Sequence, residues 1–122
     1  MTKKLYLFPI IFILTAAAVG VYFFYFRTGV HQTFSINLTE NTFSPQQITI
    51  QKGDTVIFTT SRGIPFWPAS DPHPTHDNYP GFDPKRPIPA NEGWPFQFDR
   101  VGTWGFHDHL DPYYRGTVQV TD

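Results

Sequence analysis

Residues 47–60 read QITIQKGDTVIFTT, and this stretch decides the fold class. Apolar side chains at every second position of residues 47–51 predict a strand with one buried face. Lys52-Gly-Asp54 signals a tight turn, and the β-branched run of residues 55–60 predicts a second strand. The same strand pattern returns in residues 33–38, 94–99, 103–108 and 115–120. Six short strands without a convincing helix indicate an all-β domain, an antiparallel Greek-key β-sandwich.

Between these strands, residues 61–95 show neither a strand period nor a helix period. Nine of the twelve prolines lie in this segment. A long irregular stretch in a small domain usually has a function or is disordered. Its aromatic content argues against disorder, so we expect an ordered, proline-stiffened loop packed over one end of the sandwich. The aromatic residues concerned are Phe66, Trp67, Tyr79, Phe82 and Trp94.

The first residues of the chain predict a membrane anchor. Residues 5–26 carry no charge, and they lie between Lys4 and Arg27. As a helix they would measure about 33 Å at about 1.5 Å per residue, enough to cross a hydrocarbon core of about 30 Å. A cleaved signal peptide is the alternative, but its apolar region is usually about 7 to 15 residues. The expected organisation is a cytoplasmic N-terminus at 1–4, a transmembrane anchor at 5–26, a linker at 27–32 and one domain at 33–122.

Charge and cysteine content narrow the function of the outer part. Two lysines before the span against one arginine after it favour a cytoplasmic N-terminus. We therefore expect a single-pass protein of the cell membrane whose C-terminal domain is extracytoplasmic, periplasmic or extracellular. Residues 28–122 carry six basic and ten acidic residues and no basic patch, so we expect no binding to nucleic acid. The chain has no cysteine, which excludes disulfides, thiol catalysis and thiolate metal ligands.

Four of the five histidines form two close pairs. His73 and His76 stand in the sequence HPTH, and His107 and His109 stand in HDH. Imidazole nitrogens suit copper, zinc, iron and nickel, and two pairs brought together by the fold would make a site of three or four nitrogens. The fifth histidine, in the linker, is interpreted as an ordinary surface residue.

The strand alternation raises a question about Asp108. In a strand, His107 and His109 share one face, while Asp108 shares the other with the apolar Trp104 and Phe106. Either the strand ends or bulges near Asp108, or the site lies on the opposite face beneath the long loop. An inward carboxylate needs a partner. Asp108 is therefore predicted to be a metal ligand or to hold one by a hydrogen bond.

Taken together, several short motifs resemble the cupredoxin framework over about residues 33–120. They are Phe43-Ser-Pro45, Ile48-Thr-Ile50, Gly53-Asp-Thr-Val56, Gly102-Thr-Trp104 and Arg115-Gly-Thr-Val118. The ligand positions depart from the plastocyanin and azurin type. Asp108 stands where that resemblance places the cysteine, Asp111 near the histidine and Tyr114 near the methionine. A blue copper site needs the thiolate, so the resemblance does not imply a blue electron carrier.

A second resemblance concerns the histidines. Multicopper oxidases, which are built from cupredoxin domains, carry an HPxH motif and a later HCH motif. His73-Pro-Thr-His76 and His107-Asp-His109 look like these two, with aspartate replacing cysteine. The resemblance implies copper-ligating histidines in similar places. It does not imply oxidase activity, because one domain cannot build an interdomain copper cluster by itself.

The resulting hypothesis is a membrane-anchored, extracytoplasmic, cupredoxin-like protein. It binds copper as Cu²⁺, or zinc as the alternative, through His73, His76, His107, His109 and Asp108, for metal handling or redox at the membrane face. Its expected partners are the membrane and a membrane redox or copper-handling complex. Two other functions stay open: a small copper oxidoreductase with an open metal site, and a metal-free interaction domain. No catalytic residue is predicted, and the oligomeric state stays open.

Overall fold

The structure is a computed structural model that describes residues 15, 17–22 and 29–122. It divides into two compact units, Met1–Val30 and His31–Asp122. In the first unit, the described residues 15 and 17–22 are helical and exposed. No helix among the described residues is long and apolar enough to cross a membrane. Most of the anchor expected at residues 5–26 lies outside the described residues and stays a prediction.

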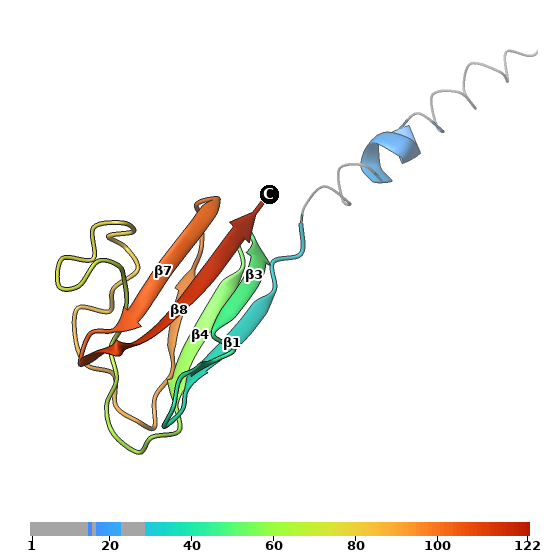
Figure 1. Ribbon diagram of the computed structural model, residues 1–122. Coiled ribbons are helices and arrows are strands. Elements are labelled where there is room, and N and C mark those ends of the chain that lie inside the picture. Colours follow the sequence, from blue (N-terminus) through green and yellow to red (C-terminus); the bar gives the residue numbers. More distant parts are fainter. Residues whose placement is uncertain (1–14, 16, 23–28) are drawn as a thin grey trace, which may run out of the picture. The chain divides into compact units, whose positions relative to one another are not determined.

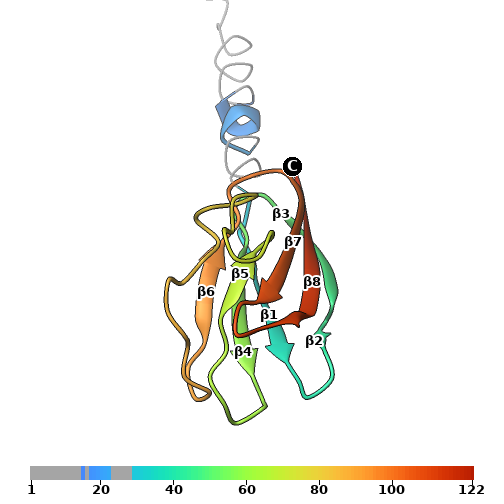
Figure 2. The ribbon, with the colours of Figure 1, turned by 60° about the vertical axis from the view of Figure 1, so that its left-hand side comes forward.

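The second unit is a sandwich of two four-stranded sheets (Figure 1). One sheet has the strand order β2-β1-β4-β6, and the other has the order β3-β8-β7-β5 (Figure 2). The strands are β1 Thr33–Leu38, β2 Phe43–Ser44, β3 Gln47–Gln51, β4 Thr55–Thr60, β5 Pro68–Ser70, β6 Trp94–Gln97, β7 Gly102–Asp108 and β8 Asp111–Thr121.

The all-β sandwich is confirmed, but the prediction that it is purely antiparallel is wrong. Strand β1 pairs with β4 in parallel, and β3 pairs with β8 in parallel. Alternation of apolar residues identifies a buried face, but it carries no information about the direction of the neighbouring strand. Two short strands were also missed: β2 lies between the predicted strands 33–38 and 47–51, and β5 lies inside the proline-rich segment.

Aromatic side chains from both sheets meet in the core. Phe106 of β7 packs edge-on against Phe43 and Phe58, with ring centroids 4.8 and 5.3 Å apart. The irregular segment of residues 61–95 adds Phe66 and Phe82, both fully buried. This burial confirms the expected packing of the segment and holds its first part beside β7, where the yellow loop lies in Figure 1.

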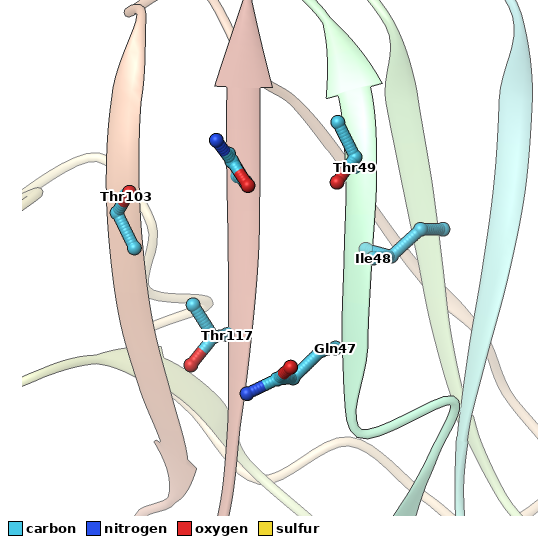
Figure 3. A pocket seen from close by; sticks show the side chains of 6 residues that line it. Gln47, Ile48, Thr49, Thr103 and Thr117 are labelled. Atoms are coloured by element: carbon cyan, nitrogen blue, oxygen red, sulfur yellow. The ribbon is translucent and has the colours of Figure 1, made fainter.

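The outer face of the second sheet is polar. A shallow groove crosses β3, β8 and β7, and its lining side chains are amides, hydroxyls and one isoleucine. Figure 3 shows Gln47, Thr49, Thr103 and Thr117 projecting from the three strands. Such side chains are weak metal ligands and poor catalytic bases, so this groove is a poor candidate for a metal site or a catalytic site.

Candidate metal centre

Four histidine side chains from two distant segments gather at one place. His73 and His76 come from the loop after β5, His107 comes from β7, and His109 from the turn that follows it. One ring nitrogen of each lies within 4.8 Å of the others. Nδ1 of His73 is 3.3 Å from Nε2 of His107, and Nε2 of His76 is 2.9 Å from Nδ1 of His109. Both predicted pairs are therefore brought together.

The end of β7 explains how His107 and His109 reach one site. The pairing of β7 with β8 shifts register between His107 and Asp108, which marks a β-bulge or irregularity. His109 has left the strand, and its backbone N–H donates to the carbonyl of Trp67 at 2.7 Å. The strand thus becomes irregular near Asp108, and the site also lies against the loop. Both alternatives posed by the sequence are realised.

A tight turn in the loop presents His76 to the site. The backbone N–H of His76 donates to the carbonyl of Pro72 at 2.8 Å, and that of Asn78 donates to Asp71 at 3.0 Å. His76 has a φ of 60°, a left-handed conformation that non-glycine residues seldom adopt. The surrounding hydrogen bonds hold this conformation, which is common where a side chain serves a function.

Two carboxylates fix the inner imidazoles. Oδ1 of Asp71 lies 2.7 Å from Nδ1 of His107, and Oδ2 of Asp83 lies 2.7 Å from Nδ1 of His76. A ring nitrogen facing a carboxylate carries the proton, so the Nε2 atoms of both rings are free to bind toward the centre. This carboxylate–histidine arrangement is typical of metal sites, where it fixes the tautomer and the ring orientation.

Each carboxylate is itself held in place. Asp71 also contacts Arg115 Nη1 at 3.2 Å. Asp83 accepts the indole N–H of Trp67 at 2.8 Å, together with the backbone N–H and the ammonium of Lys85. Burial by itself raises the pKa of Asp83, but the hydrogen bond to His76, together with those from Lys85 and Trp67, outweighs burial and holds the pKa well below its usual range. The Asp83 carboxylate therefore stays ionised and available to His76.

Burial also sets the charge of two of the histidines. It lowers the pKa of His107, although Asp71 opposes the change. It lowers the pKa of His109 as well, and the neighbouring imidazole of His76 adds to the effect. Neutral imidazole is the form that binds metal ions, so both side chains are ready for coordination near neutral pH.

The geometry and chemistry of the four nitrogens fit a transition-metal ion. Metal–imidazole bonds of about 2.0–2.1 Å require nitrogens roughly 2.9–4.1 Å apart in tetrahedral or square arrangements. Two of the pairs, at 2.9 and 3.3 Å, meet this requirement. The four nitrogens lie within 4.8 Å of one another, so the more distant ones would have to move slightly closer together on metal binding. Four neutral nitrogens and no thiolate form a borderline donor set that suits Cu²⁺ and Zn²⁺.

The structure does not bring Asp108 into this group. Its Oδ1 accepts the backbone N–H groups of Trp67 and Leu110, at 2.8 and 3.2 Å. Its Oδ2 lies 3.6 Å from Arg62 Nη1. Burial raises the pKa of this carboxyl, and the two backbone donors oppose the rise. Asp108 is thus a buried structural acceptor that ties the end of β7 to the segment before β5.

The other residues near the framework ligand positions also have structural contacts. Tyr114 donates its hydroxyl to the carbonyl of Glu40 at 3.0 Å and packs its ring under Arg62. Asp111 accepts the backbone N–H of Tyr113 at 3.3 Å. Within the described residues, neither Asp108 nor Asp111 belongs to the histidine group.

Sequence reasoning missed three contributors to the site. No sequence pattern assigns a role to Asp71 or Asp83, and Trp67 is predicted only as one of the aromatic residues of the packed loop. Their roles depend on contacts across the fold, because Asp83 orients His76 and the Trp67 ring lies 4.4 Å from the ring of His109. The only available signal was their position in the same proline-rich segment as the HPTH motif.

The comparisons with known proteins concern the fold. No family model and no curated protein matches the chain. Solved structures do, among them a purple cupredoxin from Nitrosopumilus maritimus, with 18% identity, 71% of this chain and 98% of that one covered, and a TM-score of 0.58. A mutant plastocyanin of fern matches at 19% identity, over 71% of this chain and 99% of its own, with a TM-score of 0.59.

A larger protein shares the same fold unit. The Cu-containing nitrite reductase from Thermus scotoductus matches at 17% identity and a TM-score of 0.60, over 74% of this chain and 22% of its own length. Identities this low establish the architecture only. The unit His31–Asp122 therefore has the cupredoxin fold, in a chain that contains no cysteine and that clusters four histidines.

Proposed function

We propose that this protein binds one copper ion through His73, His76, His107 and His109, and that it handles copper or supports redox at the outer face of a membrane. The observation that carries the proposal is the gathering of four ring nitrogens within 4.8 Å, two of them on rings fixed by carboxylates. Histidines that bind a metal almost always donate their other ring N–H to such a partner, which fixes the ring for coordination.

Copper is favoured over other imidazole-binding metals by the fold and by the charges. Three proteins with similar structures are a purple cupredoxin, a plastocyanin and a Cu-containing nitrite reductase. The carboxylates of Asp71 and Asp83 lie directly behind two ligand rings and offset positive charge at the metal. They therefore stabilise Cu²⁺ relative to Cu⁺. Without a thiolate the centre would be pale and resemble a type 2 site.

The proposed location is extracytoplasmic, at the membrane surface. It is supported by the uncharged residues 5–26 and by the excess of lysine on their N-terminal side. Carbonate extraction of membranes should leave the chain in the pellet, and protease added to intact cells or spheroplasts should degrade the domain. A chain that is released by carbonate, or that is protected from the protease, would contradict this part of the proposal.

Metal analysis with EPR on the full chain in detergent, loaded with Cu²⁺, tests the site itself. We expect one copper per chain and nitrogen hyperfine splitting from several imidazoles. The His107→Ala/His109→Ala variant should lose both, while a variant of the linker histidine, His31→Ala, should keep them. Weak uptake that the double substitution leaves unchanged would refute the proposal and favour a metal-free interaction domain. Stoichiometric zinc that copper cannot displace would point to the alternative metal.

A further inference from the structure

The four histidines are not held equally. His76 and His107 are buried, and each has a carboxylate 2.7 Å from its Nδ1. His109 packs on the Trp67 ring at 4.4 Å, and its backbone is tied to the same residue by a hydrogen bond of 2.7 Å. Three imidazoles therefore have supports that act whether or not a metal is present.

His73 differs from these three. It is exposed to solvent. Among the residues that the structure describes, its ring has one hydrogen-bonding contact, the 3.3 Å approach of Nδ1 to Nε2 of His107. That contact joins two nitrogens that would both bind the metal, so it would be replaced on loading. With metal bound, no hydrogen bond from outside the coordination sphere in the described structure would orient the His73 ring.

This asymmetry decides which ligand can leave. Withdrawing His76 or His107 would take one hydrogen-bond donor from Asp83 or Asp71 and an imidazole out of a buried position, which costs free energy. Withdrawing His73 moves an already exposed imidazole into water, where its nitrogens are solvated. The free-energy cost of breaking the metal bond is therefore lowest at His73.

We propose that His73 is the exchangeable ligand of the centre and that metal enters and leaves on its side, by ligand exchange with a nitrogen donor such as an imidazole of a partner protein. This inference rests on the proposed copper function. In the exchange, Nδ1 of His73 leaves the ion as the incoming imidazole nitrogen bonds. Coordination number and charge are conserved, and no electron or proton transfer is needed. The protein would then act in metal transfer, and its three anchored histidines would keep the ion until the exchange.

The test compares His73→Ala with His109→Ala in the full chain in detergent. We expect His73→Ala to bind one Cu²⁺ with affinity reduced by at most about tenfold, or about 1.4 kcal/mol. Free imidazole should then restore the wild-type EPR spectrum. Copper transfer to EDTA should be faster than from the wild type. In His109→Ala, affinity should fall far more, and imidazole should not restore the spectrum. His76→Gln serves as a second anchored variant if His109→Ala does not fold.

The outcomes separate the two proposals. If the wild-type chain takes up no stoichiometric copper, the proposed function fails. If the wild type binds copper but His73→Ala loses as much affinity as the anchored variants, the exchange inference is overturned and the copper function stands. An EPR spectrum of His73→Ala that imidazole leaves unchanged would overturn the inference in the same way.

Discussion

Oδ2 of Asp83 lies 2.7 Å from Nδ1 of His76, only seven residues earlier in the chain. The same carboxylate accepts the indole N–H of Trp67, whose ring packs on His109. One side chain therefore orients a candidate ligand directly and a second one through an aromatic neighbour. Loss of the Asp83 carboxylate should therefore disturb the orientation of two candidate ligands, His76 and His109.

Substituting Asp83→Asn should weaken Cu²⁺ binding by about 10- to 100-fold, because the amide cannot supply the charge that holds the His76 tautomer. Competition with a chelator of known affinity measures the change. Asp77→Asn is the matched control, since Asp77 is exposed and the described structure has no hydrogen bond between it and His76. Equal losses in both variants would mean that general surface charge, rather than ligand orientation, sets the affinity.

A methyl group at Gly105 should displace the other carboxylate. A Cβ atom there would lie 2.5 Å from Oδ2 of Asp71, so Asp71 would have to move away from His107. We expect Gly105→Ala to lower copper affinity by about tenfold or more, with a small change in melting temperature. At Gly81 a Cβ would make only an ordinary contact at 3.9 Å, so Gly81→Ala should bind copper normally. Unchanged affinity in Gly105→Ala would show that Asp71 is not needed for binding.

Loading with Cu²⁺ should quench the fluorescence of Trp67. Its ring lies 4.4 Å from that of His109, and quenching by a bound Cu²⁺ ion falls steeply with distance. The Trp67→Phe variant should lose most of the metal-dependent change in emission. Trp104→Phe should retain it, because the Trp104 ring packs on Tyr79 and, among the described residues, on none of the four histidines. The opposite result would place the bound copper elsewhere.

The Asp108→Asn variant should bind copper with nearly unchanged affinity. The asparagine can still accept the backbone N–H groups of Trp67 and Leu110, and the position lies outside the histidine group. A calorimetric titration compares the variant with the wild type. A large loss of affinity with an intact fold would return Asp108 to the role of ligand that the sequence suggested.

The Tyr79 hydroxyl donates a hydrogen bond to Asp99 and should make stability depend on pH at both extremes. The bond lowers the pKa of Asp99, so its contribution is present above the unfolded pKa of about 3.9 and is lost as pH falls through the folded pKa.

At the alkaline end, burial and the bond to Asp99 raise the pKa of Tyr79 to about 12. Stabilisation is then full below the unfolded pKa of about 10 and is lost as pH rises through the folded pKa. The melting temperature of Tyr79→Phe should fall below that of the wild type near neutrality. The difference should shrink in strong acid and strong base. A difference that is independent of pH would exclude this linkage.

Much of the sandwich was predictable because strand alternation is a local property. The bounds of residues 33–38, 47–51 and 55–60 were predicted as the structure has them. The short β5 was not, because Pro68 and its neighbours carry no alternation and pair with β7 only through the fold. Parallel pairing was missed for the same reason, since strand direction depends on crossovers far along the chain.

The four histidines of the site could be predicted from the sequence. The residues that hold them in place could not. Pairs of imidazoles two and three residues apart are visible in the sequence. The placement of Asp108 was not, because an irregularity between His107 and Asp108 decides what each side chain faces. The contacts of Asp71 with His107 and Arg115 join residues 36 and 44 positions apart, which no local pattern reports.

The proximity of His76 to His109, 33 residues later, has a consequence for unfolding. A metal ion bound by both would close a loop that contains the whole of β6 and β7, much as a covalent cross-link does. Such a closure restricts the denatured chain and costs it conformational entropy. The order in which segments open under denaturant would then differ between apo and loaded protein.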